Sequence, residues 1–89
     1  MDEHRRLDGN AAAGVLREIF PFEMTIAQTA CARCGSISRV GALVVYVHDM
    51  GTILRCVGCE NALIRVARGP GRYWLDLRGI KYLQIEEAR

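Results

Sequence analysis

The chain has 89 residues, of which 51% are apolar and 25% are charged, and its formal net charge is +2. This length and composition exclude an intrinsically disordered chain and a multidomain protein, and they indicate one small globular domain over residues 1–89. No apolar run approaches the roughly 18 residues of a membrane-spanning helix. The charged N-terminus has no apolar secretion segment, so we expect a cytoplasmic protein without membrane association.

The first quarter of the chain predicts a tail followed by one short helix. Residues 1–10 are polar and are expected to form a flexible tail. Asp8 or Asn10 would cap a helix over residues 11–20. Five apolar residues of this helix recur at helical spacing and would form a single buried face: Ala12, Val15, Leu16, Ile19 and Phe20.

The remaining elements are predicted to be β-strands. Apolar and polar residues alternate over residues 22–28, which is typical of a half-buried strand. Residues 42–47 are apolar on both faces, as expected for a central strand. A weaker alternation over residues 80–85 predicts a last strand. Residues 22–85 are therefore expected to form one antiparallel ribbon, and the fold class is small α+β, mainly β.

A hairpin with a defined register is predicted near the C-terminus. Residues 62–68 and 73–77 flank the sequence Gly-Pro-Gly-Arg at 69–72, and Pro followed by Gly is typical of a type II turn. A four-residue loop would set these opposite pairs: Arg65 with Asp76, Ala67 with Trp74, Ile64 with Leu77 and Val66 with Leu75. A three-residue loop would place Arg68 against Arg72 and mix polar with apolar side chains on both faces, so we favour the four-residue loop.

All four cysteines occur in two Cys-x-x-Cys pairs, CARC and CVGC, which are separated by 21 residues. Two such pairs joined by a hairpin suit a tetrahedral tetrathiolate site, although the usual spacing is about 15–20 residues. In a reducing compartment paired cysteines are metal ligands more often than disulfides. We therefore predict one structural Zn²⁺, with iron as the alternative metal, held by four residues: Cys31, Cys34, Cys56 and Cys59.

The residues after each pair bear on how the turns are made. Gly35 follows the first pair and allows a tight left-handed turn that points N–H groups at the thiolates. Glu60 and Asn61 follow the second pair, and there we expect Asn61 to accommodate the left-handed conformation.

The two cysteine pairs around a hairpin resemble the zinc-ribbon superfamily. The segments LDGNAAAGVLREIF, CARCG, CVGCE and RGPGRYWLDLRGIKYL together resemble a small family of uncharacterised bacterial zinc-ribbon proteins. This resemblance covers almost the whole chain and implies metal ligation by the four cysteines, without an assigned activity. Rubredoxin-like iron proteins are less similar, since glycine follows only the first pair and aromatics are only 7%. Nickel metallochaperones with a two-knuckle ribbon use a histidine after the initiator Met, where this chain has Asp2.

Five residues of the predicted hairpin form a second candidate site, for a partner: Arg65, Arg68, Arg72, Trp74 and Arg78. An exposed tryptophan among arginines suits base stacking with phosphate contacts, or a protein-binding hot spot. The alternative is that Trp74 covers the sheet edge and the arginines are solvated. From Cys31 to Lys81 the chain has eight basic and three acidic residues, which is compatible with an anionic partner.

No catalytic arrangement is apparent. Every cysteine is assigned to the metal, and His4 and His48 lie in polar stretches where we expect them to be solvent-exposed rather than ligands. We therefore predict a non-enzymatic zinc-binding module that acts as an adaptor for an unknown protein partner. The alternative function is nucleic-acid or nucleoprotein binding through the basic ribbon face, and electron transfer and metal delivery are less favoured.

Overall fold

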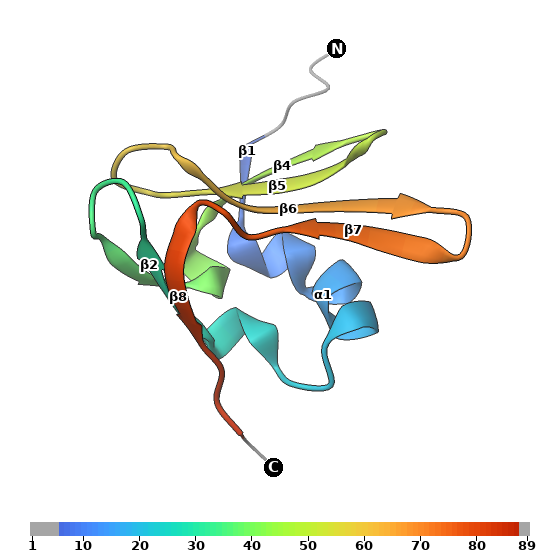
Figure 1. The fold of residues 1–89 in the computed structure, drawn as a ribbon, viewed down its shortest axis with the longest axis horizontal. Helices are drawn as coiled ribbons and strands as arrows, with labels where there is room; N and C mark the ends of the chain where they lie inside the picture. Colours follow the sequence, from blue (N-terminus) through green and yellow to red (C-terminus); the bar gives the residue numbers. More distant parts are fainter. Residues whose placement is uncertain (1–5, 88–89) are drawn as a thin grey trace.

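The computed structural model describes residues 6–87, and within them the chain forms two antiparallel sheets and one α-helix (Figure 1). The large sheet has the order β1-β4-β5-β6-β7, with these bounds: Arg6–Asp8, Val44–His48, Gly51–Arg55, Ala62–Gly69 and Arg72–Asp76. The small sheet has the order β3-β2-β8, with these bounds: Ile37–Arg39, Gln28–Cys31 and Ile80–Gln84. The predicted class, small and mainly β with one short helix, is confirmed.

The N-terminal helix is shorter than predicted, because its first turn is a 3-10 helix. The turn η1 covers Gly9–Ala12, and α1 covers Ala13–Ile19. Asp8 caps η1 by accepting a hydrogen bond from the backbone N–H of Asn10 at 3.1 Å. The predicted apolar face packs into the core, with Ala12 and Leu16 buried at 1% exposure and the other three members partly buried against them.

The core lies between the large sheet and the helical segments. In Figure 1, α1 and the 3-10 turns lie on one side of the large sheet, which we call its inner face. Paired positions across three strands of this face are buried: Val45, Leu54 and Ile64. Burial of such side chains stabilises the fold by about 1.5–3 kcal/mol each.

The opposite side of the large sheet, its outer face, carries no helix among residues 6–87 (Figure 1). The register places two rows of side chains on this face. One row is Tyr46, Ile53, Arg65 and Asp76, and the other contains His48, Ala67 and Trp74. The outer face is therefore a solvent-facing surface of mixed aromatic, apolar and charged side chains.

The predicted register of the hairpin is correct over the whole ladder, which begins at Arg65 and Asp76 and so does not include the predicted pair of Ile64 and Leu77. Arg65 pairs with Asp76, Val66 with Leu75 and Ala67 with Trp74. The ladder extends one pair further than expected, to Gly69 and Arg72, so only Pro70 and Gly71 form the loop. Gly71 has φ 69°, as the third position of a type II turn requires.

Three predictions about the chain path are wrong. Residues 22–27 do not form the predicted strand, and β2 begins only at Gln28: Met24–Ile26 is a 3-10 turn, η2, that buries Met24 while the chain reverses from α1 into β2. Residues 6–8 of the predicted tail form β1, because Leu7 pairs with Val45 and covers the edge of β4. Residues 1–5 lie outside the described residues.

The third wrong prediction is the single ribbon. The strands after residue 22 divide between two sheets, because the chain crosses from the large sheet to the small one after β7 and pairs β8 with β2. A further 3-10 turn, η3 over Val40–Ala42, joins β3 to β4 and buries Val40 in the core. No helix of the described residues is long and apolar enough to cross a membrane.

Candidate metal centre

The first cysteine pair lies in a turn at the end of β2, which we call the first knuckle (residues 31–36). The N–H of Gly35 donates to the carbonyl of Cys31 at 2.9 Å, and the N–H of Cys31 donates to the carbonyl of Ser36 at 2.9 Å. Gly35 takes the left-handed conformation, with φ 81°. These bonds close the turn and aim both sulfurs to the same side.

The second cysteine pair follows β5 in a matching turn, the second knuckle (residues 56–61). The N–H of Glu60 donates to the carbonyl of Cys56 at 2.9 Å, and that of Cys56 donates to the carbonyl of Asn61 at 2.8 Å. The expectation that Asn61 takes the left-handed conformation is wrong, because Glu60 takes it, with φ 64°. The hydrogen-bond pattern fixes that conformation at the residue directly after the second cysteine, whatever residue stands there.

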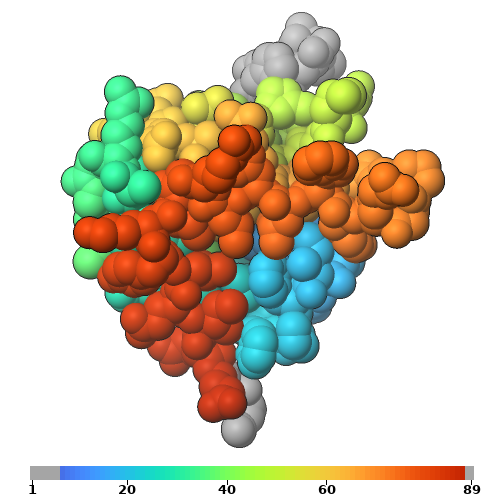
Figure 2. All heavy atoms as spheres, viewed as in Figure 1, coloured from blue at the N-terminus to red at the C-terminus, as the bar shows by residue number. Residues whose placement is uncertain are grey.

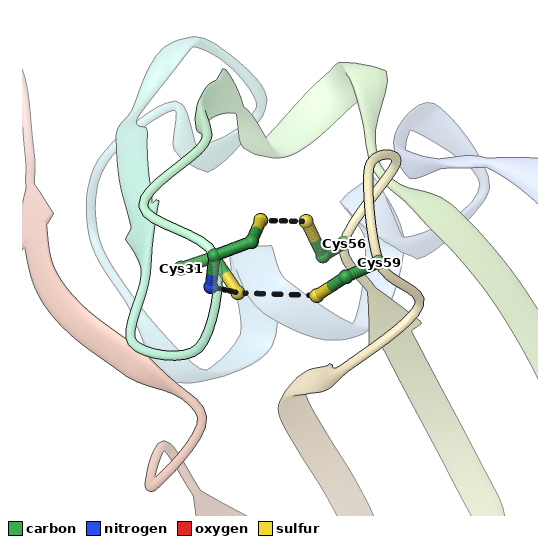
Figure 3. Close-up of side chains that lie close together, drawn as sticks. Cys31, Cys56 and Cys59 are labelled. Atoms are coloured by element: carbon green, nitrogen blue, oxygen red, sulfur yellow. Dashed lines mark hydrogen bonds between the residues drawn. The ribbon is translucent and has the colours of Figure 1, made fainter.

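The two knuckles face one another and bring the four sulfurs together (Figure 3). Cys31 Sγ lies 3.7 Å from Cys59 Sγ, and Cys34 Sγ lies 3.6 Å from Cys56 Sγ. All four lie within 4.8 Å of one another. A tetrahedral site with metal–sulfur bonds of about 2.3 Å requires sulfurs about 3.8 Å apart, so these residues fit a tetrathiolate metal ion. A disulfide would need about 2.05 Å.

Hydrogen-bond donors surround the sulfurs, and they would stabilise thiolate charge. Cys31 Sγ accepts from the backbone N–H groups of Arg33 and Cys34 at 3.4 and 3.5 Å, and from the side-chain amide of Asn61 at 3.7 Å. Cys56 Sγ accepts from the N–H of Gly58 at 3.3 Å. Such donors orient metal ligands and reduce the charge that the metal must balance.

The pKa values of the thiols differ because their surroundings differ. Burial acts to raise the pKa of Cys31, but the backbone N–H donors and the Asn61 amide outweigh it and lower the pKa to about 6. The Ser36 side chain, 3.1 Å from Cys34 Sγ, lowers the pKa of Cys34. For Cys59 the backbone N–H of Asn61 is opposed by burial and by the neighbouring thiols, which raise its pKa to about 11. A metal cation would therefore bind a partly ionised site and release the remaining protons.

One carbonyl anchors both knuckles to the crossing between the sheets. The Gly79 carbonyl accepts from the N–H of Ala32 at 2.9 Å and from the side-chain amide of Asn61 at 3.2 Å. A Cβ atom at Gly79 would lie 1.8 Å from the Ala62 carbonyl oxygen, so only glycine fits there. Sequence reasoning missed Asn61 and Gly79 as supports of the site, because their contacts are long-range and no local pattern indicates them.

The structure separates the five residues of the predicted partner site. Trp74 and Arg65 lie on the outer face, and Trp74 is 69% exposed. Arg68 lies on the inner face, where it bonds Glu18 of α1 and lies 5.4 Å from the Tyr73 ring. Arg72 pairs with Gly69 at the tip of the hairpin, which projects beyond the helix in Figures 1 and 2.

The fifth residue, Arg78, follows β7 and is held by Asp76. Its guanidinium donates to both carboxylate oxygens, at 2.8 Å from Nη2 to Oδ2 and 3.2 Å from Nε to Oδ1. These bonds lower the pKa of Asp76 to about 2. The two histidines do not join the cysteines: His48 is a half-buried residue at the end of β4, and His4 lies outside the described residues.

Comparisons with known proteins identify the family of this chain but give no activity. No curated protein and no solved structure matches the chain. No zinc-ribbon family is matched, so the likeness to zinc ribbons is limited to the two cysteine knuckles. A single family model covers residues 1–88, and the chain belongs to that family, the family of unknown function DUF6510.

Proposed function

We propose that this protein is a non-enzymatic binding module in which the four cysteines hold one structural Zn²⁺ and the outer face of the large sheet binds a protein partner. The observation that carries the adaptor role is Trp74, a residue type enriched in binding hot spots, standing 69% exposed on that face. Met50, 84% exposed at the turn between β4 and β5, lines the same surface groove as Trp74. Two large apolar side chains that are exposed at one groove do not contribute to the buried core, and their position is explained by a binding role.

The ligand set supports zinc in a structural role. Four cysteine thiolates complete a tetrahedral sphere and leave no position for a reacting water. Iron has the same ligand geometry, but its rubredoxin-like sites have glycine after both cysteine pairs, and here Glu60 follows the second pair. Elemental analysis of the purified protein tests this assignment, with one equivalent of zinc in a colourless protein as the expected result.

The absence of a catalytic role is part of the proposal. Among residues 6–87, the cluster of three or more His, Cys, Asp or Glu ligand atoms is the cysteine site itself. Since those thiolates would be committed to the metal, we propose that they do not act as catalytic nucleophiles. We assign the protein to the cytoplasm for a related reason: reducing conditions keep the cysteines available as ligands.

Nucleic-acid binding is the second candidate. It is favoured by the position of Trp74 and Arg65 on the same face of the sheet, because bases stack on exposed aromatic rings and a guanidinium can bind phosphate. The protein partner is preferred because the arginines do not form a continuous row. Arg68 is turned to the inner face and Arg78 is paired with Asp76. A phosphate backbone would instead require several unpaired cations along its path.

The experiment is affinity capture from a nuclease-treated lysate, using the zinc-loaded protein and two variants of the same hairpin. Trp74→Ala removes the exposed ring, and Arg72→Gln, at the hairpin tip, is the matched control. We expect partner proteins that bind the wild type and the control but are lost from Trp74→Ala. Capture that disappears with nuclease, or that weakens steeply as salt rises, would favour nucleic acid instead.

A further inference from the structure

We propose that the partner segment is an acidic peptide, whose apolar side chain enters a groove beside Trp74 and whose neighbouring carboxylate binds Arg33 and Arg65. This inference rests on the proposed adaptor function and names the chemistry of the partner. Two adjoining hollows of the surface carry it.

The first hollow is an apolar groove on the outer face, with a volume of about 360 Å³. Met50, Ile53, Ala67 and Trp74 line it, together with His48 and the strand backbones. Binding pockets have volumes of roughly 300–1,000 Å³ and are lined mainly by apolar and aromatic side chains. The groove therefore has the size and lining to receive one or two apolar side chains.

The second hollow is polar and lies between the groove and the metal knuckles, with a volume of about 410 Å³. Arg33 of the first knuckle and Asn61 of the second knuckle line it, together with Arg65, Asp76 and Arg78. Arg65 and Asp76 line both hollows. A bound chain could thus occupy the two hollows with neighbouring residues.

The charges of the polar hollow select an anion. Three arginines face one aspartate there, so the lining has an excess of two positive charges. Arg78 and Asp76 satisfy each other. Within residues 6–87, the guanidinium groups of Arg33 and Arg65 make neither a hydrogen bond nor a close ion pair; Arg65 lies opposite Asp76, and its charge contributes to the lowered pKa of that carboxyl. Guanidinium groups bind carboxylates through paired N–H donors, so these two arginines suit one or two carboxylates.

The number of available cations favours a peptide over a nucleic-acid strand. Besides Arg68 and Arg78, Arg55 is also engaged: it donates to the Glu60 carbonyl at 3.0 Å and lies 5.8 Å from the Tyr46 ring. Arg72 is also on the outer face, but it lies at the hairpin tip and lines neither hollow. The polar hollow therefore offers the guanidinium groups of Arg33 and Arg65 next to an apolar groove. That arrangement complements an apolar residue flanked by Asp or Glu.

The metal site would position half of the anion site. Arg33 lies between Cys31 and Cys34, and its N–H donates to Cys31 Sγ. The guanidinium is thus attached to a turn whose shape the metal fixes. Peptide binding should consequently require the zinc-loaded protein.

The test begins with selection of peptides from a random-sequence display library on the immobilised zinc-loaded protein. We expect enriched sequences with an aromatic or branched apolar residue next to Asp or Glu. A selected peptide is then synthesised with its acidic residues intact and with each replaced by Gln or Asn. Because Trp74 is the only tryptophan, a blue shift of its emission on peptide addition reports directly on groove occupancy.

Three variants separate the proposal from its alternatives. Trp74→Ala and Arg65→Gln should each weaken peptide binding, measured by anisotropy of the labelled peptide, by about 10-fold or more. Arg72→Gln should change it less than about 2-fold, and all three should keep the zinc content and melting temperature of the wild type. The peptide whose acidic residues are replaced by Gln or Asn should bind the wild type about 10-fold more weakly than the acidic peptide does. With Arg65→Gln, the difference between the two peptides should be smaller, because only Arg33 remains.

Other results would overturn the inference. Enrichment of basic or neutral peptides, no enrichment over Trp74→Ala, or tighter binding of a single-stranded oligonucleotide that displaces the peptide would each contradict an acidic ligand. If the lysate still yields a protein partner that depends on Trp74, the adaptor function stands and only its acidic chemistry is wrong. If that partner is also missing, the proposed function fails as well.

Discussion

The two metal knuckles have the same length and matching backbone hydrogen bonds, yet they differ at the residue that must take the left-handed conformation. In the first knuckle that residue is Gly35, with φ 81°, and in the second it is Glu60, with φ 64°. A side chain in this conformation costs roughly 1–2 kcal/mol. The second knuckle thus carries a strain that the first lacks.

The surroundings of the second knuckle explain how it tolerates this strain. Arg55 donates to the Glu60 carbonyl, and the Asn61 amide bonds both Cys31 Sγ and the Gly79 carbonyl. Gly58 is in close contact with the first knuckle, since a Cβ there would lie 2.9 Å from Ser36 Oγ. The second knuckle is held on several sides and takes its conformation from its neighbours.

The first knuckle is more exposed and contributes outward-facing side chains. Cys34 is exposed whereas Cys59 is half-buried, and Arg33 occupies the position that Gly58 has in the second knuckle. In Figure 2 the first knuckle forms the left edge of the molecule. The two knuckles therefore have the same cysteine spacing but different roles. The second knuckle helps to fix the fold, and the first also contributes side chains to the surface.

The largest effect is expected where the knuckles are equivalent, at the metal ligands. Cys56→Ser should release the metal and unfold the domain, because zinc contributes roughly 10–16 kcal/mol and net stability is typically about 5–15 kcal/mol. Cys31→Ser should do the same. Zinc content and far-UV circular dichroism measure both. A folded, protease-resistant Cys56→Ser protein would show that the metal is dispensable.

The second prediction concerns Gly35, the left-handed residue of the first knuckle. Gly35→Ala should destabilise the zinc-loaded protein by about 1–2 kcal/mol, because it introduces the strain that Glu60 already carries. Urea unfolding measures the change. Gly14→Ala is the control, since Gly14 has open space around it and no positive φ, and it should leave stability equal or slightly higher. An unchanged Gly35→Ala midpoint would contradict the strain argument.

The third prediction concerns the supports of the thiolates. Asn61→Ala should cost about 1 kcal/mol, since it removes the side-chain hydrogen bond to Gly79. It also removes a donor that helps to hold the pKa of Cys31 near 6. A higher pKa means that protonation begins at a higher pH, so the midpoint of acid-induced zinc release should rise. Ser36→Ala, beside the exposed Cys34, should shift that midpoint less. A larger shift with Ser36→Ala would mean that Ser36 supports the thiolates more than Asn61 does.

The smallest expected effect is a small increase in the free energy of unfolding. Glu60→Gly removes the left-handed strain of roughly 1–2 kcal/mol but adds a backbone entropy cost of roughly 0.5–1 kcal/mol. The net result is a stabilisation of about 0.5 kcal/mol, measured as a higher urea midpoint with unchanged zinc content. A destabilised Glu60→Gly protein would mean that the side chain of Glu60 contributes to the fold.

The parts of this fold that could be predicted depend on local patterns. Spacing alone placed the four cysteines together, because two residues between ligands fit a single turn. Pro70 and Gly71 determined the hairpin register, because together they specify one turn type. The apolar face of the helix was likewise readable from its period.

The parts that could not be predicted depend on distant partners. The pairing of β2 with β8 joins segments that share no local signal, so the small sheet was not foreseen. Residues 22–28 alternate like a strand, but only Gln28 pairs with neighbouring strands, and the chain turns over residues 24–26 instead. The candidate surface was divided for the same reason: Arg68 is turned inward by Glu18, which also accepts a hydrogen bond from the Tyr73 hydroxyl at 2.6 Å.

The position of Gly79 has a consequence for how the protein matures in the cell. All four cysteines precede it, and it lies twenty positions downstream of Cys59. A nascent chain that has exposed its cysteines during translation still lacks the Gly79 carbonyl that anchors both knuckles, and it lacks β8, one of the two strands that pair with β2. Metal acquired at that stage would bind an unsupported ligand set, so the native centre can form only after residues 79–84 have also been synthesised and have left the ribosome.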